Sequence, residues 1–496
     1  MTLANPPAQL LIDGKLRAAS EGATFDIVNP ATEEVIGVAP EATDSDVDAA
    51  IDAARRAFDE TTWSTDLDFR VRCLRQLHAA LVEQGPAMRA LTTAEGGAPT
   101  SLTTGPQYDV PVQSLAWTID LAESYEWTRD LGAATPMGVP THRTIRREAT
   151  GVVAAITPWN FPNQINLAKV GPALAAGNTV VLKPAPDTPW VAAELGRLVA
   201  EHTDIPPGVF NVVTSSRVEA GAALTTDARV DLVSFTGSTA TGRAVMAAAA
   251  QTLKRVFLEL GGKSAAIVLD DGDLGAGAGV AAFSVCVHAG QGCALTTRLV
   301  VPRAQYEQAV EIAANTMRHI PVGDPTDPAT VCGPLVSERQ RERVESYLRS
   351  AVEEGGRFAT GGGRPTALDR GYYIEPTVIA GLDNSATAAR EEIFGPVLVV
   401  IPHDGDDDAV RIANDSPYGL SGAITSADPQ RARAVAARVR TGTLSVNGGV
   451  WFSGDAPFGG YKQSGIGRET HKIALSNYQQ TKCLLVSYDA KPLGFF

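Results

Sequence analysis

A thiol and a carboxylate are the two side chains of this sequence best placed for chemistry. Cys293 stands in the run Gly-Gln-Gly-Cys-Ala at 290–294, and Glu259 stands earlier, in Leu-Glu-Leu-Gly-Gly-Lys at 258–263. Small residues around a thiol let a substrate approach closely, and a carboxylate on another segment can act as a base toward the thiol or toward water. Each run alone is typical of ordinary structure, because a lone cysteine is usually a small buried residue and a Gly-Gly pair usually a tight turn. Together they supply two of the parts that covalent chemistry on a carbonyl group needs.

A third segment, Phe-Thr-Gly-Ser-Thr-Ala-Thr-Gly at 235–242, has features of an anion site. It follows an apolar strand and opens an Ala-rich helix, so backbone N–H groups and the positive end of the helix dipole point at one place. It lacks the GxGxxG spacing, and a simple strand–helix turn is an equally good interpretation. The run Gly-Gly-Lys-Ser at 261–264 resembles the end of a phosphate-binding loop, but position 257 is Phe where that loop requires glycine, so this interpretation is rejected.

Composition indicates an ordinary globular protein without a polyanion-binding character. The chain has 496 residues, 44 % of them hydrophobic and 20 % charged, and a net charge of −14. That charge argues against nucleic acid or an anionic membrane as a main partner. The length corresponds to about three domains.

The cysteines and the N-terminus bear on the compartment. Neither a zinc site nor a disulfide framework is indicated, so we expect no metal and a reducing compartment. The N-terminus has no basic region followed by an apolar stretch, and no apolar run is long enough to span a bilayer. We therefore expect a cytoplasmic protein. The five cysteines, scattered and without a CxxC pair, are Cys73, Cys286, Cys293, Cys332 and Cys483.

The elements that must position these residues follow an α/β pattern. Asp13-Gly14 predicts a hairpin, and Ser45 with Asp48 three residues later predicts the start of a helix. Beyond residue 151, short apolar runs alternate with helical stretches, which predicts parallel sheets up to about 261 and again from 263 to 460. The expected strands are 151–156, 179–182, 209–213, 230–235 and 298–301.

Two β-like stretches stand apart from these halves. Residues 141–148 alternate polar and apolar side chains, and residues 481–488 include Cys483, Leu484, Leu485 and Val486. We interpret both as edge strands that pair with another subunit, because an uncovered edge invites pairing.

Motifs along nearly the whole chain resemble those of the NAD(P)-dependent aldehyde dehydrogenase superfamily. Many independent motifs in family order make chance agreement implausible. The matching runs are Pro-Trp-Asn-Phe-Pro at 158–162, Val-Leu-Lys-Pro-Ala at 181–185, Phe-Thr-Gly-Ser at 235–238, Leu-Glu-Leu-Gly-Gly-Lys at 258–263, Gly-Gln-Gly-Cys at 290–293, Glu-Glu-Ile-Phe-Gly-Pro at 391–396 and Pro-Phe-Gly-Gly at 457–460.

The resemblance implies an α/β fold of three parts. They are a Rossmann-type NAD(P)-binding domain at 1–128 and 150–261, a catalytic α/β domain at 262–462, and a small β oligomerisation domain at 129–149 and 478–496. The small domain implies a homodimer or a homotetramer.

The resemblance also implies catalytic roles. Cys293 is the nucleophile, and its backbone N–H forms the oxyanion hole with the side-chain amide of Asn160. Glu259 activates the water that releases the acid, and its presence argues against relatives that pass the acyl group to coenzyme A. Glu469 and Lys169 match a proton relay, although a salt bridge that fixes the C-terminal segment is an equally good interpretation.

The cofactor residues implied in the same way include one departure from the family pattern. Pro186 stands where many NAD-preferring members have a glutamate for the adenosine ribose, so a 2′-phosphate meets no repelling carboxylate there. No arginine follows nearby to bind such a phosphate, and we expect NAD, with NADP as the alternative. The implied cofactor-binding residues are Ile156, Thr157, Pro158, Trp159, Asn160, Lys183, Ala185, Pro186, Phe235, Thr236, Gly237, Ser238, Glu259, Leu260, Gly261, Glu392 and Phe394.

Substrate preference is inferred from aromatic positions. The implied substrate-binding residues are Phe161, Trp451, Phe452 and Phe458. An aromatic tunnel suits medium-chain aliphatic or aromatic aldehydes, and the absence of arginine from 283–292 argues against a carboxylated semialdehyde. His288, where the family usually has asparagine, is expected to be structural. The alternatives are a CoA-acylating or NADP-preferring semialdehyde dehydrogenase and a non-catalytic family member.

Overall fold

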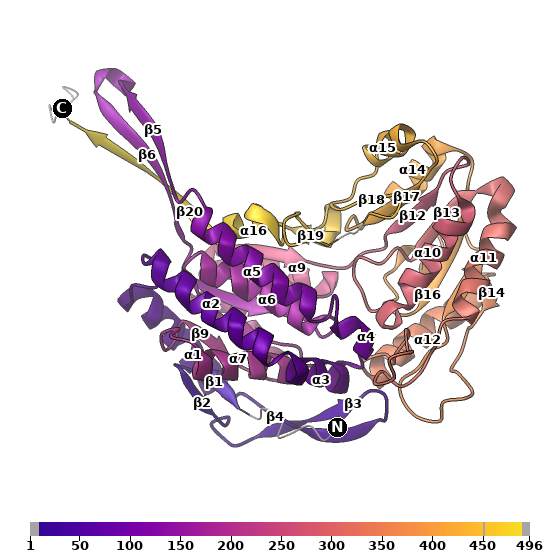
Figure 1. Ribbon diagram of the computed structural model, residues 1–496, viewed down its shortest axis with the longest axis horizontal. Helices are drawn as coiled ribbons and strands as arrows, with labels where there is room; N and C mark the ends of the chain where they lie inside the picture. The colour runs from indigo at the N-terminus through magenta and orange to yellow at the C-terminus, as the bar shows by residue number, and fades with distance from the viewer. Residues whose placement is uncertain (1–8, 450–451, 489–496) are drawn as a thin grey trace.

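The computed structural model describes residues 9–449 and 452–488 and consists of two α/β units and an arm (Figure 1). The first unit is built on an eight-stranded sheet, and the second unit is built on a seven-stranded sheet. A separate three-stranded sheet forms the arm, which projects away from both units at the upper left of Figure 1. The α/β fold class expected from the sequence is thereby confirmed.

The sheet of the first unit is parallel at its centre and antiparallel at both ends. Its central strands are buried on both faces, which explains their continuous apolar sequence. In sheet order the strands are β19 (Gly465–Ile466), β11 (Arg255–Glu259), β10 (Leu232–Thr236), β7 (Val152–Ile156), β8 (Thr179–Lys183), β9 (Phe210–Val212), β1 (Leu10–Ile12) and β2 (Lys15–Arg17). The Asp13-Gly14 hairpin between β1 and β2 is confirmed.

Helices cover both faces of this sheet. Alternate residues of β7 belong to different apolar clusters: Val153 and Ala155 pack with one set of helices, and Val152 and Ala154 pack with the other. The first set is α2 (Leu67–Glu83), α3 (Gly85–Gly96), α5 (Asp109–Ser124), α6 (Pro162–Ala175) and α7 (Trp190–His202). The second set is α1 (Asp44–Glu60), α8 (Val218–Thr226) and α9 (Thr239–Ala249). The short helix α4 (Thr100–Thr103) and the hairpin of β3 (Thr24–Asn29) and β4 (Glu34–Pro40) complete the unit.

The start of α1 differs from the prediction by two residues. Thr43 is the N-cap, and it forms a reciprocal capping box with Asp46 instead of the expected pair Ser45 and Asp48. Asp46 takes the capping position because its carboxylate is fully buried. This carboxylate also accepts hydrogen bonds from Arg17 of β2 and from Ser20, which follows that strand. These contacts from distant residues are invisible in the local sequence.

The second unit has a mainly parallel sheet with one apolar core. In sheet order its strands are β14 (Arg357–Thr360), β15 (Thr377–Ala380), β16 (Val397–His403), β13 (Arg298–Pro302), β12 (Ala265–Val268), β17 (Gly422–Thr425) and β18 (Ser445–Val446). Its helices are α10 (Leu274–Cys286), α11 (Tyr306–Arg318), α12 (Glu338–Glu353), α13 (Thr387–Arg390), α14 (Asp406–Asn414) and α15 (Pro429–Ala436).

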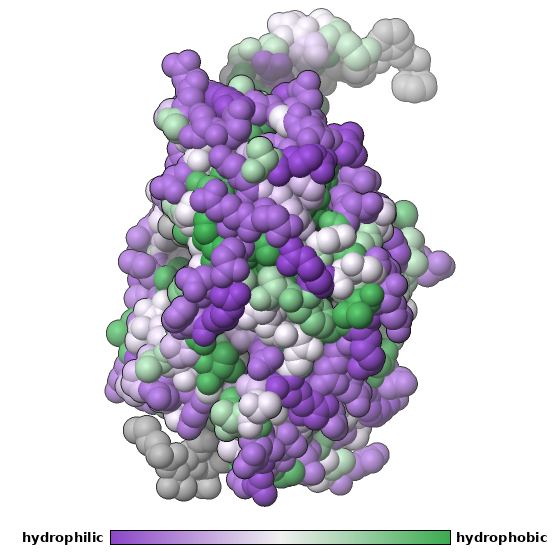
Figure 2. Space-filling model, turned by 90° about the vertical axis from the view of Figure 1, so that its right-hand side faces the viewer, coloured by the Kyte–Doolittle hydropathy of each residue, from purple (hydrophilic) through white to green (hydrophobic). Residues whose placement is uncertain are grey.

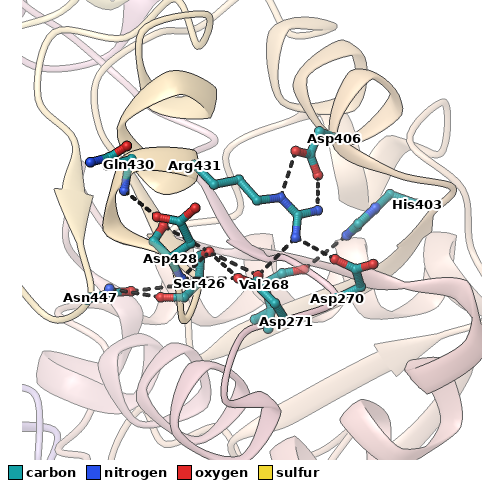
Figure 3. Close-up of polar contacts among 10 residues, drawn as sticks. All are labelled: Val268, Asp270, Asp271, His403, Asp406, Ser426, Asp428, Gln430, Arg431 and Asn447. Atoms are coloured by element: carbon teal, nitrogen blue, oxygen red, sulfur yellow. Dashed lines mark hydrogen bonds and ion pairs between the residues drawn. The ribbon is translucent and has the colours of Figure 1, made fainter.

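A polar cluster ties the ends of these strands to α14 and α15 (Figure 3). The guanidinium of Arg431 lies 2.7 Å from a carboxylate oxygen of Asp270, 3.1 Å from one of Asp271 and 2.6 Å from one of Asp406. The Ser426 hydroxyl donates to Asp271, and Asn447 bonds both backbone groups of Ser426. One arginine shared among three carboxylates thus fixes the edge of the sheet at β17 and β18.

The arm corrects one interpretation of the sequence. Its strand order is β20 (Gln479–Ser487), β6 (Thr141–Ala149) and β5 (Thr128–Ala134), so β6 is the central strand and not an edge. Both backbone edges of β6 are paired within this chain, and among the described residues β5 and β20 are the outer strands of this sheet. The late strand predicted near 481–488 is confirmed as β20.

The surface of the second unit carries hydrophobic residues in separate groups among hydrophilic ones (Figure 2). In the described part of the chain, no helix combines the length and apolar character needed to cross a membrane.

The two units meet where strand ends of opposite polarity face each other. β7, β10 and β11 end at Ile156, Thr236 and Glu259, and the chain continues from β11 through a short Gly-Gly turn into β12 of the second unit. Cys293 precedes β13, and Glu392 precedes β16. Carboxyl ends of the first sheet and amino ends of the second therefore converge on one region, where α/β proteins usually bind ligands.

Arg298 at the start of β13 fixes this junction from within the core. Its side chain is 1 % exposed and donates to the carbonyl oxygens of Lys263, Ile412 and Ala413 and to the side chain of Asn384. It thus connects the strand that follows Cys293 to the segment that follows Glu259.

We expect Arg298→Ala to lower the free energy of unfolding by about 3 kcal/mol or more, because it leaves several buried carbonyl groups without donors. The measurement is urea unfolding followed by fluorescence, with Arg303→Ala as the control. Arg303 is an exposed arginine that pairs only with Asp404, so its loss should change little. Equal unfolding midpoints for the two variants would contradict this account of Arg298.

Candidate active site

A cavity of about 260 Å³ lies at the junction of the two units. It brings together residues from the ends of β7, β10 and β11 with residues that precede β13 and β16. Its walls are formed by Pro158, Trp159, Asn160, Thr236, Gly237, Ser238, Leu260, Gly261, Cys293, Gln340, Arg343, Glu392 and Phe394. Eleven of these residues were predicted from the sequence, and Gln340 and Arg343 were not.

The loop that presents Cys293 has an unusual backbone. After α10, a 3-10 turn at Val287–Gly290 contains His288 at φ 49°, Ala289 at φ 52° and Gly290 at φ 73°, all in the left-handed region. Non-glycine residues rarely adopt this conformation, so the surroundings must impose it. A Cβ at Gly290 would overlap the carbonyl of Gly395. Because glycine has no Cβ, the loop can pack directly against the segment before β16.

Gln291 of the Gly-Gln-Gly-Cys run cross-links this loop and is fully buried. Its amide donates to the carbonyl oxygens of His288 and Pro334 at 3.1 and 3.3 Å, and its oxygen accepts from the N–H of Val336 at 2.8 Å. The motif glutamine therefore fixes the position of the thiol.

The loop of Cys293 packs directly on the Gly-Gly turn that follows Glu259. A Cβ at Gly262 would overlap the carbonyl oxygen of Cys293, so glycine is required for this approach. The Cys293 side chain is partly exposed. Burial raises its pKa above the usual range, and the carboxylates of Glu392, Glu259 and Glu469 raise it further.

Asn160 lies against the same loop. Its side-chain amide donates to the backbone carbonyl oxygen of Gln291 at 2.9 Å. The backbone carbonyl oxygen of Asn160 accepts from the side-chain amide of Gln107 at 2.9 Å. One amide hydrogen is committed to Gln291, and the second remains for an oxygen bound next to Cys293.

Glu259 has a buried carboxyl group without a hydrogen-bond partner among the described residues. It is 4 % exposed, and neither oxygen has a hydrogen-bond partner among the described residues. Burial raises its pKa well above the usual value, Glu469 adds to that effect, and Lys169 and Arg468 oppose it. A carboxyl group with a raised pKa suits proton transfer near neutral pH.

Lys169 and Glu469 form a buried ion pair. The Lys169 ammonium is fully buried and lies 3.1 Å from a carboxylate oxygen of Glu469 and 3.2 Å from the hydroxyl of Ser234. Glu469 also pairs with Phe458 through both backbone groups, in an isolated β-bridge. The salt bridge is therefore present, next to the carboxylate whose protonation it affects.

The cavity wall fits a dinucleotide cofactor. The Thr236 hydroxyl is buried without a partner among the described residues, and α9 begins just beyond it with Ser238 as its N-cap. Glu392 accepts from the N–H of Gly262 at 2.8 Å, which leaves its second oxygen for a ligand hydroxyl. Burial raises the pKa of Glu392 to about 7. The rings of Trp159 and Phe394 pack edge to face, with their centres 5.4 Å apart.

The remaining predicted cofactor residues are not part of the wall of this cavity. Ile156 pairs with Lys183 across β7 and β8, and the N–H of Thr157 donates to the carbonyl of Lys183 at 3.1 Å. Ala185 and Pro186 are half-buried in the loop after β8, and Phe235 packs under the turn at Gly237.

Lys183 donates to the carbonyl of Ser215 at 3.1 Å, and burial lowers its pKa to about 8, partly offset by the charge of Glu41. Arg217 follows two residues after Ser215. Its guanidinium is paired with Asp44 at 2.7 Å.

Gln340 and Arg343 of α12 are the residues that sequence reasoning missed. Gln340 donates to the carbonyl of Phe394 at 2.8 Å, and Arg343 donates to the carbonyl of Glu392 at 2.7 Å. They lie on a polar, charged helix, where nothing in the local pattern separates them from an exposed face.

The predicted substrate residues form two aromatic pairs. Phe161 meets the ring of His288 at 5.4 Å, and Phe452 meets Phe458 at 6.0 Å. Phe452 also lines a small recess between α5 and α6. Trp451 lies outside the described residues.

His288 is buried, and the backbone of Asn160 lies close enough to its ring to raise its pKa slightly against the effect of burial. Burial lowers its pKa to about 4, so the ring is neutral and contributes shape rather than charge. Within 9–449 and 452–488, no cluster of His, Cys, Asp or Glu could bind a metal ion.

Comparison with known proteins agrees with this geometry. The sequence model of the aldehyde dehydrogenase family matches residues 17–484. A 3-succinoylsemialdehyde-pyridine dehydrogenase from Pseudomonas is 42 % identical over 96 % of this chain and 98 % of its own length. A geranial dehydrogenase from Castellaniella defragrans is 39 % identical over 95 % of this chain and 97 % of its own.

Solved structures agree over the whole fold. Betaine aldehyde dehydrogenase from Staphylococcus aureus in complex with NAD+ superposes with a TM-score of 0.96 at 34 % identity, covering 100 % of this chain and 98 % of that one. Aldehyde dehydrogenase C from Pseudomonas syringae, a cysteine-to-alanine mutant complexed with NAD+ and octanal, superposes with a TM-score of 0.92 at 38 % identity, covering 97 % and 96 %. The chain therefore belongs to the aldehyde dehydrogenase family.

Proposed function

We propose that this protein oxidises an aldehyde to its carboxylic acid with NAD, through a thioester on Cys293. The Cys293 thiol gives its proton to solvent and its sulfur adds to the carbonyl carbon, while the Asn160 amide and the backbone N–H of Cys293 donate to the resulting alkoxide. NAD, when bound, would supply the acceptor for the hydride that leaves this carbon. Glu259 then takes a proton from water, whose oxygen attacks the thioester, and passes that proton to the cleaved sulfur to regenerate the thiol.

The buried, unpartnered carboxylate of Glu259 carries this proposal. Its charge reaches Cys293, because it is one of the groups that raise the pKa of that thiol. A structural carboxylate at such depth is expected to be paired, whereas a base must keep its oxygens available for water. The same feature favours hydrolysis over transfer to coenzyme A.

NAD as cofactor is supported by the lining of the cavity and by the two structural neighbours complexed with NAD+. The roles proposed are Thr236, Gly237 and the start of α9 for the pyrophosphate, Lys183 for the adenosine ribose and Glu392 for the nicotinamide ribose. Pairing of Arg217 with Asp44 argues against a 2′-phosphate site, so we favour NAD over NADP.

A medium-chain aliphatic or aromatic aldehyde is the proposed substrate class. Phe161, Phe452 and Phe458 offer aromatic surface, and no arginine lies in 283–292. Relatives named for geranial and for a pyridine derivative, and a neighbour complexed with octanal, are consistent with this choice.

Assembly through the arm is proposed as well, as a homodimer or a homotetramer. The outer strand β20 exposes 62 % of Leu485 and 51 % of Val486, and its backbone edge opposite β6 is free of any other strand within the described chain. Exposed apolar side chains on a free edge favour strand pairing with another copy.

Cys293→Ala should abolish NADH formation with octanal and NAD in the absence of coenzyme A, whereas Cys286→Ala should retain it.

Glu259→Gln should still form up to one NADH per site and then slow by about 100-fold or more, because the thioester lacks its base. Intact-mass measurement should detect the acyl adduct in Glu259→Gln. Turnover that requires coenzyme A would contradict the hydrolytic step, and faster turnover with NADP would contradict the cofactor choice.

The proposed substrate class predicts a kcat/KM for octanal at least about tenfold above that for succinate semialdehyde, because burial of the alkyl chain supplies binding energy. Phe452→Ala should lower the value for octanal by about tenfold, while Phe58→Ala, which removes a half-buried ring that lines neither the cavity nor the recess at Phe452, should not. A clear preference for the semialdehyde would overturn this class.

An equilibrium mass measurement should give at least twice the chain mass of 51.9 kDa. Leu485→Glu should shift the protein toward the monomer by placing a charge at the proposed interface. Val35→Glu, at an exposed valine on β4, should leave the mass unchanged. A monomeric wild type would disprove assembly.

A further inference from the structure

The environment of Lys169 contains two groups that the mechanism has not used, Ser234 and Tyr478. Ser234 is fully buried on β10, and its hydroxyl lies 3.2 Å from the Lys169 nitrogen and 2.9 Å from the hydroxyl of Tyr478. Tyr478, just before β20, is also fully buried. Buried hydroxyl and ammonium groups are costly unless they form hydrogen bonds, so the bonds among these three groups determine how they are held.

Strand register places Ser234 on the same sheet face as Glu259. Ser234 lies opposite Phe257 across β10 and β11, and Thr236 lies opposite Glu259. Because side chains alternate along a strand, all four belong to the face on which α6 supplies Lys169. The ammonium also lies 4.7 Å from the centre of the Phe257 ring, so carboxylate, hydroxyl and ring surround it.

Donor capacity fixes one hydrogen bond of this cluster. An ammonium only donates, so Ser234 accepts from Lys169. Between the hydroxyl groups of Ser234 and Tyr478 either oxygen can be the donor. Ser234 therefore connects the Lys169 ammonium to the hydroxyl of Tyr478.

We propose that Ser234, oriented by Tyr478, is a positioning residue for the hydrolytic step, because it holds the Lys169 ammonium where its charge acts on Glu259 and Glu469. The inference rests on the proposed function, in which Glu259 must be ionised to take a proton from water. The charged or titratable groups around Glu259 are Glu469, Lys169 and Arg468, with Cys293 and Tyr478 close enough to be affected. Of these, Lys169 and Arg468 favour the ionised form, and Ser234 acts through Lys169.

The sign of the effect follows. A raised pKa leaves Glu259 protonated at low pH, so hydrolysis falls as pH decreases through that pKa. Loss of the Ser234 hydroxyl weakens the hold on the ammonium, Glu259 is then less stabilised as a carboxylate, and the acidic limb of the pH profile moves to higher pH.

The test measures hydrolysis of the acyl-enzyme against pH, by intact mass after rapid mixing of octanal with the NAD-saturated enzyme. Ser234→Ala should hydrolyse the adduct about tenfold more slowly at pH 7, the size expected for one hydrogen bond to a charged group, and should recover as pH rises. The initial burst of NADH should be unchanged, and Ser234→Thr, which keeps the hydroxyl, should restore the profile.

Thr179→Val is the matched control, because it removes a fully buried hydroxyl of the same sheet, on β8, that donates to the Ala54 carbonyl. It should lower stability without moving the pH profile. If Ser234→Ala does not fold, Tyr478→Phe removes the hydroxyl that is bonded to Ser234 and should shift the acidic limb in the same direction by a smaller amount.

An unshifted acidic limb in a folded Ser234→Ala variant, or in Tyr478→Phe when that variant is the one available, overturns the inference. An equal shift in Thr179→Val also overturns it. Absence of both the NADH burst and the adduct in the wild type contradicts the proposed function instead, so the two failures are distinguishable.

Discussion

Close approach of backbone segments that lack side chains is the constraint on which the site depends. Gly262 packs against the carbonyl of Cys293, and Gly290 packs against the carbonyl of Gly395; a Cβ at either position would overlap the opposing atom. These contacts bring the turn after β11, the loop before β13 and the segment before β16 into one place. Glycine removes the steric barrier but adds no attractive contact of its own. The energy that holds these three segments together must therefore come from other residues.

That energy comes from buried polar cross-links and from the two apolar cores. Gln291 bonds three backbone groups around the thiol loop, and Arg298 bonds three carbonyl groups and an amide behind it. Both side chains are essentially inaccessible to solvent, where an unmade hydrogen bond is costly. The loop of Cys293 can therefore retain three successive left-handed residues, whose conformational strain the surrounding contacts offset.

Desolvation then sets the chemistry of the site. Glu259, Glu469 and Glu392 are carboxylates around a single thiol. Burial raises the pKa of Glu259, of Glu392 and of the Cys293 thiol, which favours the neutral form of these three groups. The Lys169 ammonium opposes this effect at Glu259, and it is itself surrounded by Glu469, Ser234 and the Phe257 ring. The protonation of this base thus results from a balance between burial and the charges of Glu469, Lys169 and Arg468.

The sequence by itself determined the parts whose information is local or carried by motifs. The alternation of apolar runs with helices predicted two parallel sheets, and seven short motifs identified the family together with the Cys293, Glu259 and Asn160 cluster. Tertiary structure decided what depends on residues far apart in the chain. The N-cap of α1 is Thr43 because Asp46 accepts hydrogen bonds from Arg17 and Ser20. β6 is a central strand because β20 arrives from the other end of the chain. Gln340 and Arg343 line the cavity from α12, a helix with no distinctive pattern. Motifs record the chemistry that a residue type allows, whereas partners, burial and charge balance arise only when distant segments are brought together.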